Sequence, residues 1–390
     1  MAAALRLASP DPRVSVVIPC LNEAGNIQEC IRTARRVLDE NGISGEIIVV
    51  DNGSDDGSAE LADAAGATLV RQPERGYGNA YLAGFDAARG DYIVMIDADL
   101  TYDFDEIPRF VRELDRGGDL VMGNRLRGVE PGAMSLLSRV GNPLLSGFLN
   151  LLYRTPIRDA HCGMRALRRT LLPTLDLQST GMEFASEMVI RAARARLEIR
   201  ELPIALHPRG GESKLSPFRD GWRHLRLMLV YNPTFLFVLP GATMLLLGAT
   251  VMLLVFARVS ILGHGLFIHT LIAGSLLTVA GIQLICFGLC GKIYAAYQLG
   301  DCDRWLERMQ ARLRLEHGLL VGAFVILSGL GIEAVIFAKW ISRGLGSLGE
   351  QRLAVLAATL VIAGIQIFFT SFLLSLLGLR RRSATTSRHP

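Results

Sequence analysis

The stretch DYIVMIDADLTYD, residues 91–103, decides the fold class. It opens with an apolar run at residues 92–96, which is typical of a strand buried on both faces. The run leads directly into two carboxylates one residue apart, Asp97 and Asp99. Ligands of open α/β sheets bind beyond the carboxyl ends of the strands. The stretch therefore predicts a helix-covered sheet with a polar site at its edge.

Similar segments alternate with helical ones up to about residue 230. Apolar or β-branched runs predict strands at residues 14–19, 46–51, 67–71, 92–97 and 119–125, and helices fit the intervals. This alternation predicts an α/β, Rossmann-like domain with a mostly parallel sheet. Polar or turn residues follow three of the strands, so we expect them at one edge of the sheet. These residues are Pro19, Asn22, Glu23, Asp51 and Asp97.

The composition changes after residue 233. Half of the 390 residues are hydrophobic and the mean hydropathy is +0.34, and the excess lies in four almost uncharged runs at residues 234–257, 265–291, 318–338 and 353–379. Each run is long enough for a helix to cross a hydrocarbon core of about 30 Å. Backbone groups in lipid must pair within their own segment. We therefore predict an all-α membrane domain of four transmembrane helices.

Basic residues orient these helices. They gather before the first span, between the second and third, and after the fourth, while the other two connections carry fewer. The positive-inside rule then places the N-terminal domain and both termini in the cytoplasm of a multi-pass cell-membrane protein. No signal peptide is visible, and we interpret the first 12 residues as a flexible tail. The net charge of +4 lies mostly beside the membrane, which favours contact with anionic lipid over nucleic acid.

Asp97 and Asp99 suit a divalent cation. At i and i+2 of an extended backbone, both side chains point the same way and can face one ligand. Two such carboxylates would repel each other and raise each other's pKa. Mg²⁺ or Mn²⁺ removes the repulsion and neutralises a diphosphate. A lone D-x-D is more often a helix cap beside a solvated carboxylate, so the metal interpretation depends on the surrounding motifs.

Eight motifs in order supply that context. They are VVIPCLNE (16–23), VVDNGSDDGS (49–58), RGYGNAYLAG (75–84), MIDADL (95–100), MGNR (122–125), DAHCGMRALRR (159–169), GMEFASEM (181–188) and GESKL (211–215). Over residues 14–230 the chain resembles the GT-A-fold inverting glycosyltransferases of family 2. With its membrane helices it is most similar to the polyprenyl-phosphate group, the dolichol-phosphate mannose or glucose synthases. The resemblance implies a hexosyltransferase with a UDP- or GDP-linked sugar donor, a polyprenyl phosphate acceptor and Mg²⁺ or Mn²⁺ as cofactor.

The resemblance also assigns donor-site residues. Those expected to bind the nucleotide sugar are Pro19, Asn22, Glu23, Asp51, Gly76, Asp97 and Lys214. Asp97 matches the first motif aspartate, and Asp99 matches the metal-binding, catalytic one. Two positions depart from the family pattern. Asn52 replaces a common second aspartate, and Thr101 stands where a glutamine often helps to hold the metal.

Arg125 and Arg139 match arginines that bind the acceptor phosphate in the family. Arg125 follows the fifth strand, and Arg139 lies in the amphipathic stretch 135–153, whose apolar residues suit a membrane surface. A phosphate monoester is largely anionic at pH 7 and needs no general base. We therefore expect catalysis by positioning and cations, with in-line attack on the anomeric carbon and inversion. For His161 we expect a structural hydrogen bond.

The predicted boundaries are a tail (1–12), a GT-A domain (13–215), a juxtamembrane amphipathic helix (216–233), a transmembrane hairpin (234–291), a cytoplasmic amphipathic connector (292–317), a second hairpin (318–379) and a basic tail (380–390). VAGIQL (279–284) and IAGIQI (362–367) lie 83 residues apart, so we interpret the hairpins as copies, with Gln283 and Gln366 equivalent inside the bundle. Chance similarity of apolar sequence is the alternative.

Two other functions stay open. A processive polysaccharide synthase would share the sheet and the D-x-D, but it should carry a Q-x-x-R-W segment, which this sequence lacks. An inactive membrane scaffold or a lipid-linked sugar transporter would not need a complete set of donor-site residues. The oligomeric state is open as well, and a homo-oligomer is one candidate.

Overall fold

The computed structural model describes residues 11–209, 217–261, 264–298, 315–346 and 349–377. The chain forms two compact units, Met1–Met228 and Leu229–Pro390. Several predicted features lie outside the described residues: Lys214, most of the N-terminal tail, most of the connector between the hairpins, and the basic tail.

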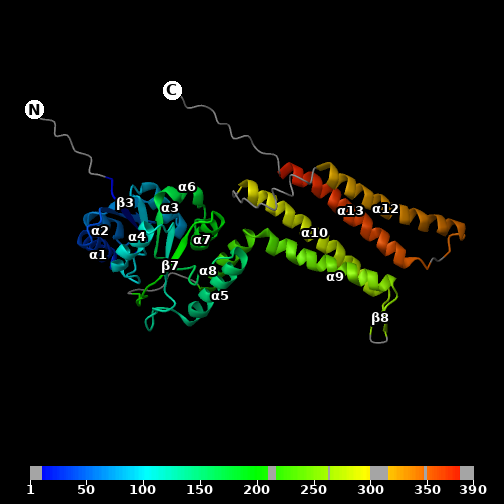
Figure 1. Cartoon of the computed structure of the whole chain (residues 1–390), viewed down its shortest axis with the longest axis horizontal. Helices are drawn as coiled ribbons and strands as arrows, with labels where there is room; N and C mark the ends of the chain where they lie inside the picture. The colour runs from blue at the N-terminus through cyan, green and yellow to red at the C-terminus, as the bar shows by residue number, and fades with distance from the viewer. Residues whose placement is uncertain (1–10, 210–216, 262–263, 299–314, 347–348, 378–390) are drawn as a thin grey trace, which may run out of the picture. The chain divides into compact units, whose positions relative to one another are not determined.

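A seven-stranded sheet forms the centre of the first unit (Figure 1). Its strands are β1 (Val14–Cys20), β2 (Gly45–Asp51), β3 (Thr68–Arg71), β4 (Tyr92–Met95), β5 (Leu120–Asn124), β6 (Arg165–Arg168) and β7 (Ile199–Pro203). Their order is β3-β2-β1-β4-β6-β5-β7, and only the pairs made by β6 are antiparallel. The predicted mostly parallel α/β sheet is confirmed. The apolar-run criterion did not find β6 and β7, because both are short and carry arginines.

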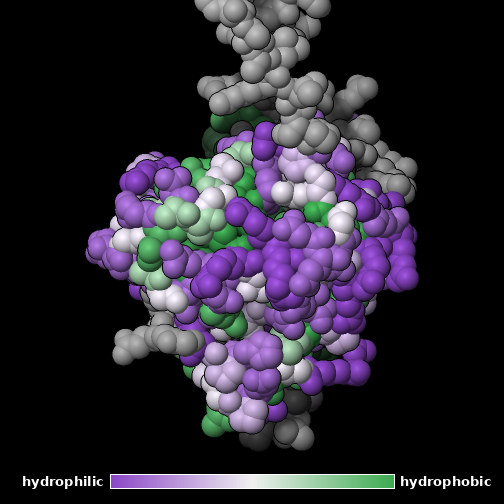
Figure 2. All heavy atoms as spheres, turned by 90° about the vertical axis from the view of Figure 1, so that its left-hand side faces the viewer, coloured by the Kyte–Doolittle hydropathy of each residue, from purple (hydrophilic) through white to green (hydrophobic). Residues whose placement is uncertain are grey.

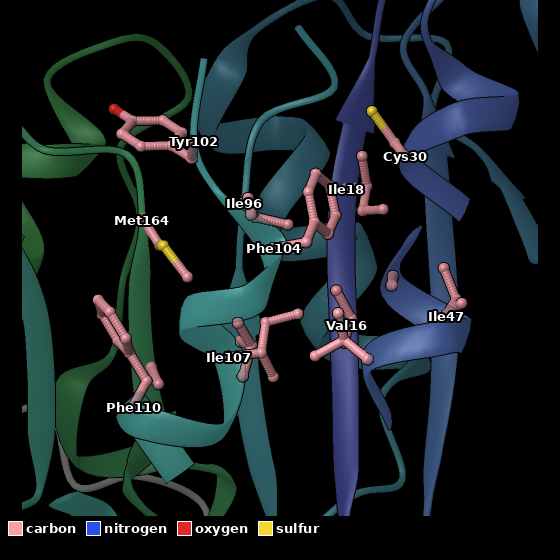
Figure 3. Close-up of a cluster of buried hydrophobic side chains, with 14 of the residues drawn as sticks. Val16, Ile18, Cys30, Ile47, Ile96, Tyr102, Phe104, Ile107, Phe110 and Met164 are labelled. Atoms are coloured by element: carbon pink, nitrogen blue, oxygen red, sulfur yellow. The ribbon is translucent and has the colours of Figure 1, made fainter. Parts of the chain in front are cut away.

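Helices cover both faces of this sheet. The helices described up to residue 230 are α1 (Ile27–Glu40), α2 (Ser58–Ala64), α3 (Tyr77–Ala87), α4 (Ile107–Asp115), α5 (Leu136–Tyr153), α6 (Leu172–Leu175), α7 (Phe184–Arg194) and α8 (Pro217–Val230), with short 3₁₀ turns at Phe104–Glu106 and Arg169–Leu171. Val16 and Ile18 of β1 pack with Phe110 of α4 in a core cluster on one face (Figure 3). Val17 points to the other face, where a Cβ on Gly84 of α3 would lie only 2.4 Å from its Cγ1. Gly84 therefore lets α3 approach the sheet closely.

One edge of the sheet collects several chain segments. Strands β1, β2, β4 and β5 run in the same direction, so their carboxyl ends share that edge. Strand β6 runs the opposite way, and its first residue, Arg165, is paired with Met95 of β4 and Met122 of β5. The segment that enters β6, residues 159–164, therefore reaches the same edge as Asp97 and Arg125.

Among its described residues, the second unit contains four helices that are long and apolar enough to cross a membrane. These candidate spans are Thr234–Phe256, Ile268–Ala296, Leu315–Ser342 and Gln351–Leu377. They correspond to a π-helical turn (Thr234–Val238) with α9 (Leu239–Phe256), then α10 (Ile268–Gln298), α12 (Leu315–Ser342) and α13 (Gln351–Leu377). A short hairpin of β8 (Ser260–Ile261) and β9 (His264–Gly265) joins α9 to α10. The prediction of a membrane domain with four helices is confirmed.

The two helical hairpins, α9–α10 and α12–α13 (Figure 1), share one packing register. Close backbone contacts join Gly241 to Gly281 and Gly248 to Gly274 in the first, and Gly322 to Gly364 and Gly329 to Ala357 in the second. Gly364 and Ala357 each lie 83 positions after their counterparts in α10, the spacing that separates VAGIQL from IAGIQI. Small residues let helix backbones approach in this way. The shared register supports the interpretation of the hairpins as copies.

The predicted equivalence of Gln283 and Gln366 inside the bundle is wrong for Gln283. Its side chain is exposed, whereas Gln366 is partly buried. Among the described residues, the Oε1 atom of Gln366 has no hydrogen-bond partner. Ser275 of α10 and Thr359 of α13 make a polar contact between the hairpins, with 2.6 Å between their hydroxyl oxygens.

Alanine substitutions should distinguish the packed glycines from an unpacked one. A Cβ on Gly248 would lie 2.6 Å from the carbonyl oxygen of Gly274, and one on Gly329 would lie 2.8 Å from that of Ala357. Because each pair must then separate, G248A and G329A should each lose about 1–3 kcal/mol of stability. Thermal unfolding of the detergent-solubilised protein measures this. G331A is the control, because a Cβ there has no neighbour within 4 Å, and an equal loss in G331A would contradict the packing role.

Candidate active site

The D-x-D lies in a turn rather than in a strand. Strand β4 ends at Met95, and the backbone of residues 98–99 forms a turn. The expected alternation of an extended backbone therefore does not apply, and the two carboxylates have different partners. Asp97 Oδ1 accepts hydrogen bonds from the hydroxyls of Tyr77 and Tyr81 of α3, both at 3.2 Å. Burial, and then the charge of Asp99, raise the pKa of Asp97 to about 6.

Asp99 is oriented by Thr101. Its Oδ1 accepts from the Thr101 hydroxyl at 2.6 Å and from the Thr101 backbone N–H at 3.1 Å. Its Oδ2 lies 3.5 Å from Nη1 of Arg209. The same guanidinium donates from Nη2 to Glu23 Oε1 at 2.6 Å. A cation from the chain itself therefore joins the carboxylates of Glu23 and Asp99.

The loops after β1 and β2 hold each other. The backbone N–H of Asn22 donates to Ser54 Oγ, and Asn22 Oδ1 accepts from the backbone N–H of Asp55. Asp51 is buried and accepts from the backbone N–H of Ser54 at 3.1 Å. Pro19 lies beside Val50 in the β1–β2 pairing. Pro19, Asn22, Glu23 and Asp51 are thus brought to one edge, as predicted.

Asn52 has a structural role that an aspartate could not fill. Its Nδ2 donates to the carbonyl oxygens of Gln72 and Glu74 at 3.0 and 2.8 Å, while its Oδ1 accepts from the backbone N–H of Gly76 at 2.7 Å. A carboxylate would place negative charge against two carbonyl oxygens. The departure from the family pattern at this position therefore fixes the loop that leads into α3.

Gly76 is packed against the protein. A Cβ there would lie 2.2 Å from the carbonyl oxygen of Thr180, and one on Gly78 would lie 2.0 Å from that of Ser179. Both glycines admit the backbone of residues 179–180, and the N–H of Asn79 donates to Thr180 O at 3.2 Å. The two glycines therefore serve this close approach between chain segments. Contact of Gly76 with a nucleotide sugar stays a prediction.

Arg125 is held by a carboxylate. Its Nε and Nη2 donate to Oδ2 and Oδ1 of Asp159 at 2.7 and 2.8 Å, and Asp159 is fully buried. Burial opposes ionisation of Asp159, but the Arg125 guanidinium lowers its pKa. Arg125 Nη1 lies 3.4 Å from the hydroxyl of Tyr102, which also accepts from the backbone N–H of Gly163 at 2.9 Å. This leaves other N–H groups of the guanidinium for a ligand.

The buried side chain of Arg165 fixes the segment that enters β6. Arg165 is fully buried and donates to the carbonyl oxygens of Ala160, Cys162 and Ala185, at 2.8 to 2.9 Å. His161 Nε2 lies 3.3 Å from Ser186 Oγ, so the structural contact predicted for this histidine is confirmed. Ser186 Oγ also lies 2.8 Å from Nδ1 of His224 in α8.

Arg139 lies on the exposed side of α5. This helix buries only Ser146 and Leu149, and it exposes large apolar side chains. The large apolar residues exposed on α5 and on the neighbouring α8 are Leu136, Leu137, Val140, Leu144, Leu151, Phe218, Trp222 and Val230. In contrast, the face of the first unit visible in Figure 2 is mostly hydrophilic.

The carboxylates fit a cation that arrives with a ligand. Among the described residues, no three His, Cys, Asp or Glu side chains converge to hold a metal ion by themselves. Asp97 and Asp99 supply hard oxygen atoms, and Mg²⁺ is commonly held by one or two carboxylates together with substrate phosphates and water. The donor set therefore matches a metal–diphosphate complex.

Sequence reasoning missed Arg209, Tyr77, Tyr102 and Asp159 as parts of the site. Three of them do lie within stretches that were quoted: Tyr77 in RGYGNAYLAG, Tyr102 in DYIVMIDADLTYD and Asp159 in DAHCGMRALRR. Arg209 belongs to none of them, and its distance of 186 positions from Glu23 in the sequence gives no signal.

Two family models match the chain: Glycosyl transferase family 2 over residues 15–175, and the Glycosyltransferase family 2 C-terminal transmembrane region over residues 289–378. The low-salt glycan biosynthesis hexosyltransferase Agl6 of Haloferax volcanii is 43% identical over 94% of this chain and 89% of its own length. A dolichyl-phosphate hexose transferase of the same organism is 34% identical over 53% of this chain and 89% of its own length. An undecaprenyl-phosphate 4-deoxy-4-formamido-L-arabinose transferase of Pseudomonas fluorescens is 34% identical over 53% of this chain and 61% of its own length.

The contact between α7 and α8 should make the first unit sensitive to acid. Burial lowers the pKa of His224 to about 4 and lowers that of His161 well below its usual range. Because the folded protein disfavours both imidazolium forms, their contribution to stability is complete above about pH 6.5 and is lost as the pH falls. For His224 alone the loss should reach about 3 kcal/mol near pH 4.

Unfolding by denaturant at several pH values measures this loss. H224Q should flatten the pH dependence between about pH 6.5 and 4. H207Q is the control, because His207 is partly exposed and pairs with Glu130. An unchanged slope in H224Q would contradict the assignment.

Proposed function

The chain is a membrane protein of glycosyl transferase family 2, and we propose that it transfers a hexose from a nucleotide diphosphate sugar to a polyprenyl phosphate. The activity as a glycosyltransferase follows from family membership. The donor, the acceptor, inversion at the anomeric carbon and reaction at the cytoplasmic face are the proposed parts.

The observation that carries the proposal is that acidic and basic side chains lie close together at one edge of the sheet. Asp97 and Asp99 follow strand β4. The ion pair of Arg125, which follows β5, with Asp159, which precedes β6, lies at the same edge. Tyr102, three residues after Asp99, contacts Arg125 and the segment before β6. The carboxylates that we propose for a metal-bound diphosphate therefore lie close to a cation that we propose for a second phosphate.

This arrangement suits a reaction between two anions. The acceptor phosphate is already a nucleophile at neutral pH, so the protein must chiefly position it and neutralise charge. When bound at Asp97 and Asp99, Mg²⁺ or Mn²⁺ would stabilise the departing nucleoside diphosphate. The open N–H groups of Arg125 would orient the acceptor oxygen, with Arg139 as a second contact. His161 is half-buried and its Nε2 lies 3.3 Å from Ser186 Oγ, so we assign it a structural role rather than a role in proton transfer.

Two observations support a lipid acceptor. Relatives at 34% identity carry names that specify dolichyl phosphate and undecaprenyl phosphate. Arg139 also lies on a helix that exposes apolar residues, such as Leu136 and Val140, next to α8 with its exposed Trp222. An apolar helix face bearing basic groups is typical of contact with a bilayer surface. The basic flanks of the spans support a location of this surface on the cytoplasmic side.

Removing the Asp99 charge should abolish turnover. D99N keeps the shape of the side chain but weakens its hold on a divalent cation, so transfer of labelled sugar to a short-chain prenyl phosphate should fall at least about 100-fold. A panel of UDP- and GDP-sugars with Mn²⁺, scored by lipid-soluble product, measures it. D86N is the control, since Asp86 is exposed on α3. Full activity in D99N would refute the metal assignment.

Removing the Arg139 charge should act on the acceptor alone. Loss of one charge-assisted contact predicts that R139Q raises the KM for prenyl phosphate roughly tenfold and leaves the KM for the nucleotide sugar unchanged. Initial rates over both substrate concentrations separate the two constants. R112Q on α4 is the control, because Arg112 is also an exposed arginine. An effect on the nucleotide sugar alone would count against the acceptor role.

A further inference from the structure

Arg209 is the feature of the donor site that the proposed reaction leaves unexplained. Its guanidinium lies 2.6 Å from Glu23 Oε1 and 3.5 Å from Asp99 Oδ2. The side chains of Glu23 and Asp99 are only 12% and 13% exposed, so these ion pairs are shielded from bulk water. One cation thus neutralises two carboxylates from different loops.

The backbone fixes Arg209 over these carboxylates. Residues 204–207 run along the site, where the N–H of Leu206 donates to Gly128 O at 2.9 Å and that of His207 donates to Thr101 O at 3.0 Å. Thr101 also holds Oδ1 of Asp99. Asp99 is therefore oriented so that its second oxygen, Oδ2, faces Arg209. A metal ion bound to Oδ2 would meet the guanidinium directly.

A divalent cation and a guanidinium compete for the same oxygen. Both are positive, and bringing them together beside one carboxylate is unfavourable at low exposure. The diphosphate of a donor removes this conflict, because its oxygen atoms offer Arg209 a bidentate partner of the kind that the guanidinium fork suits. When diphosphate and metal enter together, the diphosphate thus offers Arg209 a new partner in place of Asp99.

We propose that Arg209 neutralises the carboxylates of the empty donor site. When the metal-bound donor enters, the Arg209 guanidinium moves away from Asp99 and binds the diphosphate instead. This inference rests on the proposed function. It means that Arg209 weakens binding of the metal alone and strengthens binding of the metal with a nucleoside diphosphate. The site would then take up its two ligands together.

Binding measurements without turnover test this exchange. Mn²⁺ binding to the detergent-solubilised full chain is read from the electron paramagnetic resonance signal of free Mn²⁺, first alone and then with UDP or GDP. R209Q should bind Mn²⁺ alone about fivefold more tightly than the wild type. It should bind the nucleoside diphosphate with Mn²⁺ about tenfold more weakly. A structural defect would not give opposite signs.

The control is R36Q. Arg36 also joins two carboxylates, Glu40 and Asp105, but it lies on the exposed side of α1. R36Q changes the net charge equally and should leave both affinities unchanged. R209K is a second variant, in which a retained charge without the fork should keep the wild-type affinity for Mn²⁺ alone and weaken diphosphate binding.

The possible results of these measurements separate the exchange from its alternatives. Mn²⁺ affinity in R209Q that equals or falls below the wild type overturns the exchange, and so does an equal gain in R36Q. If R209Q does not fold, undiminished diphosphate binding by R209K overturns it instead. If neither the wild type nor any variant binds UDP or GDP with Mn²⁺, the proposed function fails. The affinities for Mn²⁺ alone then still report whether Arg209 competes with a metal ion for Asp99.

Discussion

Negative charge gathered at one edge of the sheet is the constraint on which the site depends. The carboxylates are compensated in three ways. Asp97 receives two neutral tyrosine hydroxyls and has a raised pKa, Asp99 and Glu23 share the guanidinium of Arg209, and Asp159 is paired with Arg125. Asp97 is therefore a carboxylate whose ionised form the folded protein disfavours. A bound cation would lower its pKa and remove that cost.

The reversed strand β6 brings the two halves of the site together. In a wholly parallel sheet, the segment before a strand lies at the edge opposite the ligand crevice. Because β6 is antiparallel to both of its neighbours, its lead-in lies instead between the ends of β4 and β5. Asp159 thus reaches Arg125, and Gly163 faces Asp97, where a Cβ would lie 2.4 Å from Oδ2. Arg165 anchors this lead-in through three backbone carbonyl groups.

The sequence was sufficient where one chain segment carries its own signal. The parallel strands and the four membrane helices are continuous apolar runs, and their periodicity and length identify them. Strand β6 has no such signal, because its first residue is a buried arginine that only the fold can satisfy. Arg209 was missed for a related reason. Its role depends on a backbone path beside Thr101, and no local pattern encodes a contact with Glu23.

The apolar faces of α5 and α8 are consistent with the lipid acceptor that we propose. Helix α5 buries few of its own residues, so packing within the first unit accounts for little of its stability. A helix with exposed leucines is costly in water and gains when a lipid surface covers it. Helix α8 ends at Val230, and the first span begins at Thr234, so connectivity alone keeps α8 close to the bilayer. The proposed acceptor, a prenyl phosphate, would present its charged end at that depth, where the proposed nucleotide sugar could meet it from water.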